Sequence, residues 1–354
     1  MTDDKTLLRV ENLNAWFYTE EGIVKALENV SFSVARGEIL GLVGETGCGK
    51  SVTSACIMRL IPSPPGKIIG GKILFEGEDL AQATPERMRQ IRGKDIAMIF
   101  QDPMSSLNPV FTVGRQVEEA IRVHNPDMGA AQIHERAAEM FKKVNIPDPE
   151  RSMKRYPHQF SGGMKQRVMI AMALSCNPRM LIADEPTTAL DVSIQAQILS
   201  LIKDLQKDFG SSIMLISHDL GVIATMAQKV AVMYAGQIVE YGTVEEIFYD
   251  AWHPYTWALL QALPQLGTKG EALPSVDGTP PNLFNEIKGD AFAPRNKHAL
   301  AIDFVQEPPF FQVSETHAAK TWYLDPRAPK IERPHSIQNL REKMGKMGGS
   351  NLNG

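Results

Sequence analysis

Cysteine is scarce in this chain, and its few copies are too scattered for a structural role. Only Cys48, Cys56 and Cys176 occur among the 354 residues. Three thiols make no disulfide framework, and none of them stands at the spacing of zinc ligands. We therefore expect the protein to stay in a reducing compartment.

Long apolar runs and a basic excess are also missing. No run of about eighteen apolar residues occurs, so we expect no segment to span a bilayer. The first residues, MTDDKTLLRVENL, lack the basic-then-apolar order of a secretory signal. The formal net charge is −4 and the isoelectric point is near 6.1. A nucleic-acid partner usually requires a basic face, so none is expected.

A glycine-rich turn is present between a strand-like apolar run and a helix-periodic stretch. Backbone N–H groups around such a turn can surround a polyphosphate, and glycine permits the left-handed turns and the close approach. An ordinary glycine-rich turn is the alternative, but the strand before and the apolar spacing after favour the phosphate site. The predicted nucleotide-binding residues here are Gly44, Glu45, Thr46, Gly47, Cys48, Gly49, Lys50, Ser51 and Val52. Lys50 should reach the β- and γ-phosphates, and Ser51 should offer its hydroxyl to Mg²⁺.

Hydrophobic periodicity divides the rest of the chain. The first forty residues predict strands, and so do residues 72–75 and 95–100. From about residue 112 to 143 the period is helical, which indicates a helical insertion in an α/β unit. Residues 180–183 and 213–216 predict strands buried on both faces. A helix capped by Asp191 should lie between them, and a hairpin should follow over residues 230–241.

Two carboxylates follow the strand at 180–183, in the run MLIADE. ATP hydrolysis requires a held Mg²⁺ and an oriented water. Asp184 therefore suits Mg²⁺ coordination, and Glu185 suits the general base. Alone, the pair could equally cap the turn at Pro186; the phosphate loop makes that the weaker reading.

Two further polar residues follow predicted strands. His218 should hydrogen-bond the γ-phosphate, although a lone histidine at a strand end is more often a plain polar residue. Gln101 is either an ordinary loop residue or a sensor that contacts both Mg²⁺ and the water. We retain Glu185, His218 and Gln101 as catalytic candidates and Ser51, Gln101 and Asp184 as metal ligands.

A second anion site is predicted at FSGGMKQR. Ser161 should begin a helix whose first N–H groups are exposed by Gly162 and Gly163. One nucleotide does not need two phosphate sites in one chain. They make sense if two subunits face each other and each ATP lies between the loop of one and the Ser161 segment of the other.

Together these motifs resemble the ATP-binding-cassette (ABC) ATPases: GETGCGKS as Walker A, Gln101 as the Q-loop, SGGM as the signature, MLIADE as Walker B, Ala189-Leu190-Asp191 as the D-loop and His218 as the H-loop. The resemblance implies an α/β fold with a RecA-like P-loop core, an antiparallel β subdomain and an inserted helical subdomain. It places the ATPase domain at 1–260, with the helical subdomain at about 102–165. An extension would follow at 261–354, ending in a mobile tail. By position, Phe17 corresponds to the aromatic that stacks on adenine; the alternative is a strand aromatic packed in the core.

A closer resemblance is to the first of two paired ATPase subunits in oligopeptide/dipeptide importers. It rests on the segments 101–116, 156–199 and 253–264. This implies an ATP-hydrolysing motor at the cytoplasmic face of the cell membrane, coupled to uptake of peptide or of a related solute such as oligosaccharide or nickel. The implied partners are a paralogous ATPase subunit, two transmembrane permease subunits and an extracytoplasmic solute-binding protein. The competing classes are a soluble non-transport ABC ATPase and a P-loop kinase. In a P-loop kinase, the second predicted anion site at Ser161 would have no function.

The resemblance also sets expectations that depend on single residues. Many such subunits carry an iron–sulfur cluster in the extension, but Asp290, Asn296 and Asp303 stand at the likely thiolate positions, so we expect no cluster. Three histidines there should be solvated, namely His298, His317 and His335. Cys48 should be a favoured thiolate because it lies in a phosphate loop. The permease-facing surface should lie near residues 101–111, with the apolar candidates Met104, Leu107, Val110 and Phe111 either exposed for docking or packed internally.

Overall fold

The computed structural model describes residues 5–102, 106–188, 190–263, 276–338 and 340. Two sheets form its centre, one with four strands and one with eight. The predicted D-loop residue Ala189, the docking candidate Met104 and the expected mobile tail lie outside the described residues.

The N-terminal sheet is antiparallel, with the order β2-β1-β4-β5. It packs its alternating apolar side chains against the larger sheet in one shared core that includes Leu8, Leu40 and Ile182. Its strands are β1 (Thr6–Thr19), β2 (Gly22–Ala35), β4 (Gly66–Phe75) and β5 (Glu78–Asp79).

The larger sheet has the order β11-β12-β10-β9-β3-β8-β7-β6. Its members β6, β7, β8, β3 and β9 run parallel, so their carboxyl ends meet at one edge. Every residue of β3, β7 and β8 is buried, as expected for strands covered on both faces. The bounds are β3 (Ile39–Val43), β6 (Ile96–Ile99), β7 (Met180–Asp184), β8 (Ser212–Ser217), β9 (Lys229–Tyr234) and β10 (Gln237–Thr243).

Helices pack around the sheets, and the sequence predicted two of them, the one after the glycine-rich loop and the one capped by Asp191. Asp191 caps the longest described one by accepting a hydrogen bond from Ile194 N, and Gly210 ends it in the left-handed conformation. These helices are α1 (Lys50–Ile57), α2 (Pro85–Ile91), α8 (Val192–Phe209), α9 (Leu220–Met226), α10 (Val244–Tyr249) and α11 (Pro254–Gln261).

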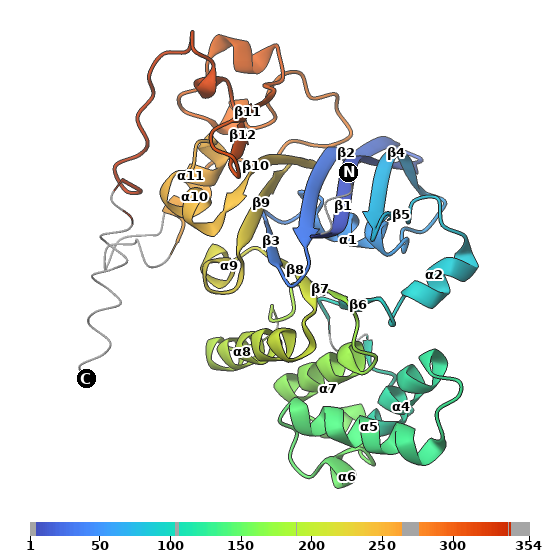
Figure 1. The fold of residues 1–354 in the computed structure, drawn as a ribbon. Helices are drawn as coiled ribbons and strands as arrows, with labels where there is room; N and C mark the ends of the chain where they lie inside the picture. Colours follow the sequence, from blue (N-terminus) through green and yellow to red (C-terminus); the bar gives the residue numbers. More distant parts are fainter. Residues whose placement is uncertain (1–4, 103–105, 189, 264–275, 339, 341–354) are drawn as a thin grey trace, which may run out of the picture.

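A block of helices stands apart from the sheets, at the bottom of Figure 1. It consists of α4 (Val113–His124), α5 (Ala130–Lys143), α6 (Pro149–Ser152), the short η1 (Pro157–Gln159) and α7 (Gly162–Leu174). Helix α7 continues past residue 165, where we expected the helical subdomain to end. Of the docking candidates, Leu107 is 3% exposed and belongs to the core of the larger sheet and the helical block, so it packs internally, whereas Val110 is 73% exposed.

The C-terminal extension continues the larger sheet. Strand β12 (Ala318–Lys320) pairs with β10, and β11 (Phe310–Gln312) pairs with β12. Short 3₁₀ turns complete it: η3 (Ala293–Arg295), η4 (Ala301–Phe304) and η5 (Trp322–Leu324). The extension and the ATPase core therefore share backbone hydrogen bonds.

The residues at the expected thiolate positions have structural contacts. Asp290 and Asp303 are buried, and each accepts a backbone hydrogen bond, from Phe292 N and Leu300 N. Asn296 donates to the Tyr323 hydroxyl. The expectation of solvated histidines is wrong for His317: it is fully buried, with Nε2 2.8 Å from the carboxylate of buried Glu240. His298 and His335 are exposed.

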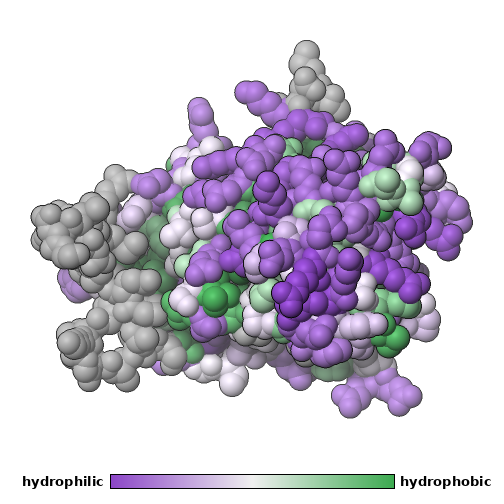
Figure 2. All heavy atoms as spheres, turned by 90° about the horizontal axis from the view of Figure 1, so that it is seen from below, coloured by the Kyte–Doolittle hydropathy of each residue, from purple (hydrophilic) through white to green (hydrophobic). Residues whose placement is uncertain are grey.

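The surface is largely polar on the face seen from below. Figure 2 shows its apolar side chains in small areas separated by polar ones. Within the described ranges, no helix has both the length and the apolar character needed to cross a membrane.

Candidate active site

The glycine-rich loop joins the carboxyl end of β3 to the start of α1, as predicted. A Cβ at Gly44 would lie 2.2 Å from the carbonyl oxygen of Met233, and Gly44 has φ +155°. Gly49 has φ +108°, and a Cβ there would lie 2.9 Å from the carbonyl oxygen of Ala26. Only glycine fits these two positions, and both therefore shape the loop. Thr46, Gly47 and Ser51 leave its outer side exposed.

Lys50 lies inside the loop that precedes it. Its ammonium group donates to the carbonyl oxygens of Gly44 at 2.7 Å and Glu45 at 3.0 Å, and the residue is only 4% exposed. A cation enclosed by a turn of backbone N–H groups makes a site for a polyanion. Val52, the next residue but one, packs its side chain against the apolar core.

Asp184 connects this loop to the next parallel strand but one. It ends β7, and its carboxylate accepts from the hydroxyls of Ser51 at 3.1 Å and Ser54 at 3.4 Å. Burial raises the pKa of Asp184 above its ordinary value, although the two hydroxyls oppose the shift. Carboxylate and hydroxyl oxygens are the donor type that Mg²⁺ prefers, so the group fits a magnesium ion.

Three side chains converge on Glu185, the residue after β7. Gln101 Nε2 donates to Glu185 Oε2 at 3.1 Å, and His218 Nδ1 lies 3.3 Å from the same oxygen. Thr188 also donates to it, at 2.8 Å. Glu185 has φ +45°, an unusual conformation for a residue with a Cβ. The structure thus brings together the three residues that the sequence named as catalytic candidates.

Thr188 and Ser54 were missed by the sequence reasoning. Thr188 stands three residues after Glu185 in a turn, and Ser54 stands three residues after Ser51 on one face of α1. These spacings are a usable signal, because residues three apart in a turn or helix point the same way.

Ser161 caps α7, and its hydroxyl accepts from Met164 N at 3.4 Å. Both Ser161 and Gly162 are exposed. A Cβ at Gly163 would lie 2.8 Å from Ile194 Cγ2, so this glycine permits the close approach of α7 and α8. Its nearest neighbours thus belong to the start of α8 rather than to the loop at 44–51.

Phe17 lies in β1, half-buried and opposite Gly66 of β4. A Cβ on Gly66 would lie 3.0 Å from Phe17 Cε1, so the glycine makes room for the ring. Its stacking on adenine stays a prediction.

The expectation for Cys48 is wrong in this structure. The residue is 5% exposed, and burial raises the pKa of its thiol, outweighing the opposing effect of Lys50. The turn of the loop faces Cys48 inward, which the sequence spacing did not reveal.

Comparison with known proteins decides the family. The profile described as "ABC transporter" matches residues 27–188, and the profile "Oligopeptide/dipeptide transporter, C-terminal region" matches residues 239–302. The oligopeptide transport ATP-binding protein OppD of Bacillus subtilis (strain 168) is 55% identical over 339 residues, 96% of this chain and 94% of that protein. The chain belongs to the ABC transporter family. It is an ATPase coupled to transport, and the α/β fold that we expected for ABC ATPases is confirmed.

Two more likenesses support this membership. The dipeptide transport ATP-binding protein DppD of Lactococcus lactis subsp. cremoris (strain MG1363) is 54% identical over 95% of this ABC ATPase and 96% of its own length. A solved dimer of the ATP-binding cassette MJ0796, in a post-hydrolysis state bound to ADP and Pi, matches with a TM-score of 0.60. That structure is 27% identical and covers 67% of this chain and 98% of its own.

Proposed function

We propose that this ABC ATPase is one of two motor subunits of a peptide importer and that each of its ATP sites is completed by the other subunit. The observation that most directly supports this proposal is the convergence of Gln101 and His218 on the carboxylate of Glu185, next to the Ser51–Asp184 pair. The names of the relatives OppD and DppD support peptides as the cargo.

In this proposal the loop at residues 44–51 holds the phosphates of ATP. Its backbone N–H groups surround them, and Lys50 shares its N–H donors between the loop carbonyls and the β- and γ-phosphates. Phe17 supports the adenine ring. Ser51, Asp184 and Gln101 hold Mg²⁺, which when bound neutralises charge on the phosphate oxygens.

Hydrolysis then requires a water in line with the γ-phosphorus. Glu185 accepts the proton of this water while the oxygen attacks and the bond to the β-phosphate oxygen breaks. Gln101 and Thr188 hold the carboxylate in place, and His218 donates to the γ-phosphate. These contacts fix the base before the nucleotide arrives, which reduces the cost of orientation.

The exposed Ser161 and Gly162 supply the second half of the neighbouring subunit's site. A helix N-terminus stabilises an anion with free N–H groups and its dipole. ATP therefore joins two ATPase subunits, and hydrolysis releases them. The paralogous subunit is the expected partner.

An apolar groove between the core and the helical block fits a permease helix. Its volume is about 610 Å³, and Leu60 and Phe100 on its wall are 42% and 45% exposed. Met98 lines it from β6, and the α7 side is formed by Met169, Met172, Ala173 and the nearby Cys176. Docking of a permease here would hold the protein at the cytoplasmic face of the membrane, with an extracytoplasmic receptor delivering the solute.

Two variants of the full complex test the proposal. Lys50→Ala should weaken ATP binding and abolish turnover, because it removes the ammonium group that the loop encloses for the phosphates. Glu185→Gln should bind ATP, keep the subunits closed and hydrolyse at least about 100-fold more slowly. Rapid turnover by Glu185→Gln would exclude Glu185 as the base.

The cargo is tested in proteoliposomes that contain both ATPases, both permeases and the solute-binding protein. Peptide added with the receptor should stimulate ATP hydrolysis and accumulate inside the vesicles. Stimulation by oligosaccharide or nickel with none by peptide would overturn the peptide assignment but leave the motor function intact.

A further inference from the structure

Arg295 connects the C-terminal extension to the phosphate loop. Its guanidinium group forms two hydrogen bonds with the Glu45 carboxylate, at 2.5 and 3.0 Å, and its side chain is only 4% exposed. A bidentate pair of this kind fixes direction as well as distance. Glu45 is the second residue of the loop, 250 positions away in the sequence.

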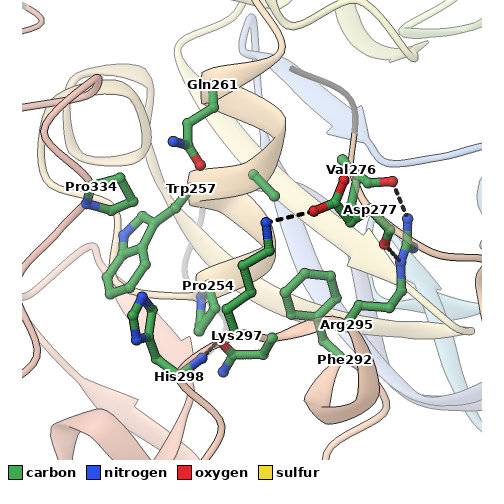
Figure 3. Close-up of a pocket in the computed structure, with 12 residues that line it drawn as sticks. Pro254, Trp257, Gln261, Val276, Asp277, Phe292, Arg295, Lys297, His298 and Pro334 are labelled. Carbon is green, nitrogen blue, oxygen red and sulfur yellow. Dashed lines mark hydrogen bonds and ion pairs between the residues drawn. The ribbon is translucent and has the colours of Figure 1, made fainter.

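Arg295 also forms hydrogen bonds with backbone oxygens of the extension. It donates to the backbone oxygens of Val276 at 3.0 Å and Asp277 at 2.8 Å, beside a cavity of about 410 Å³ (Figure 3). It also donates to the Tyr234 hydroxyl at 3.1 Å. Arg295 is thus a rigid spacer between these segments and Glu45.

A second contact holds the backbone of the same loop residue. Glu45 N donates to the Tyr255 hydroxyl at 2.7 Å, and Tyr255 packs against Tyr234 and Phe292 in an aromatic cluster. Both the main chain and the side chain of Glu45 are therefore fixed from outside the loop.

These external contacts matter because the loop is otherwise restrained by Lys50, by its own turns and by Gly236 N, which donates to the Cys48 carbonyl oxygen at 2.9 Å. Gly44, Gly47 and Gly49 lose much backbone freedom when they are ordered. When Lys50 turns some of its three N–H donors to phosphate, its hold on the Gly44 and Glu45 carbonyls weakens. The Arg295 and Tyr255 contacts use the carboxylate and the N–H of Glu45 rather than its carbonyl oxygen, so they need not change.

We propose that Arg295 is a positioning residue for ATP: it orders the phosphate loop from the extension, so that ATP affinity depends on how the extension is docked. This inference deepens the proposed function and rests on residues 44–51 being the phosphate site. Arg295 acts through Glu45, so it should change the affinity for ATP and leave the chemical step unchanged.

The test is a double-mutant cycle in the full-length chain with Arg295→Gln, Glu45→Gln and the double variant. The dissociation constant of a fluorescent ATP analogue with Mg²⁺ is measured, together with KM and kcat of the assembled complex. Each single variant should weaken binding about tenfold, and the double variant should be no weaker than either. KM should rise with kcat unchanged.

Lys297→Gln is the matched control. This residue is two positions away, is exposed and pairs with Asp277, as Figure 3 shows, without reaching the loop. It should bind ATP within about twofold of the parent chain. Thermal unfolding of every variant identifies any that fail to fold, and Arg295→Lys, which keeps the charge but not the paired geometry, should fall between the parent and Arg295→Gln.

Two results overturn the inference: folded Arg295 variants that bind ATP as the parent does, or losses that add in the double variant. Lys50→Ala distinguishes this failure from failure of the proposed function. If Lys50→Ala weakens binding while Arg295→Gln does not change it, only the positioning role is wrong. If Lys50→Ala binds normally, the phosphate site itself is wrong.

Discussion

Asp290 shows how a single substitution can change what a position does. The resemblance places a thiolate there, whereas this chain has a carboxyl group that accepts a hydrogen bond from Phe292 N. Burial raises its pKa from 3.8 to about 6, and neighbouring Asp303 adds to the shift while Lys320 opposes it. The folded protein therefore holds a proton here that the unfolded chain releases.

This gives a pH dependence with a definite sign. Between about pH 4 and pH 6 unfolding releases the proton, so the contribution of Asp290 to stability falls as the pH rises. Asp290→Asn should raise the free energy of unfolding by about 1–3 kcal/mol at pH 8 and give no gain at pH 4. Urea unfolding at both pH values measures this. An equal gain in the free energy of unfolding at pH 4 and pH 8 would mean that the charge of Asp290 is not the cause. The control is Asp277→Asn, at an exposed aspartate.

The thiols differ in a way that labelling can detect. Burial raises the pKa of all three thiols, that of Cys56 to about 12, but Cys176 is partly exposed at the proposed permease groove whereas Cys48 and Cys56 are buried. Iodoacetamide at pH 7.5 should therefore modify Cys176 first, as peptide mass spectrometry can show. Assembly with permeases should protect Cys176; faster labelling of Cys48 would contradict the closed loop seen here.

At the scale of elements, the contact between α7 and α8 depends on one missing side chain. A Cβ at Gly163 would lie 2.8 Å from Ile194, whereas one at Gly162 would lie 3.6 Å from Leu190, an ordinary contact. Gly162 therefore has room for a methyl group, whereas Gly163 does not.

Alanine at these two positions should have opposite effects on the nucleotide-free protein. Gly162→Ala should stabilise it by up to about 1 kcal/mol through helix propensity. Gly163→Ala should destabilise it because the helices must separate. Ile194→Ala should relieve that clash. Gly163→Ala should therefore lower the unfolding temperature less in the Ile194→Ala background than in the parent chain. Equal destabilisation with and without Ile194 would refute this packing.

Elements were predictable where local pattern decides them. Residues 39–43, 180–183 and 213–216 are apolar runs of strand length and lie in β3, β7 and β8, and Asp191 and Ser161 cap the helices that they were expected to cap. The convergence on Glu185 followed from polar residues after parallel strands, whose carboxyl ends meet.

Other features depend on contacts that no local pattern encodes. The burial of His317 results from its pairing with Glu240, and the Arg295–Glu45 pair joins residues 250 positions apart. Neither residue has a periodic or motif context that indicates its partner. The inward direction of Cys48 likewise depends on the turn of the loop rather than on its composition.

For the whole molecule, the extension is part of the sheet rather than an appendage. Backbone pairing of β12 with β10 covers an edge, and His317 Nε2 lies 2.8 Å from the carboxylate of buried Glu240. A chain ending at residue 263 would lose both. It should unfold at a lower temperature and aggregate, because an exposed strand edge remains and the Glu240 carboxylate loses its imidazole partner.

Calorimetry and light scattering of the truncated chain, compared with the full chain, test this. His317→Gln in the full chain is a useful comparison, because it removes the imidazole but keeps the edge covered. A truncated chain as stable and soluble as the full one would show that the ATPase core is complete without the extension.

The position of Gln101 connects movement of the helical block to the carboxylate of Glu185. It stands two residues after β6 and donates to Glu185, and β6 lines the groove together with α7 of the helical block. In the proposed importer, a tilt of that block against the core would move Gln101 relative to Glu185, the proposed base. The docking of a permease in the groove and the orientation of that carboxylate would then be coupled through Gln101.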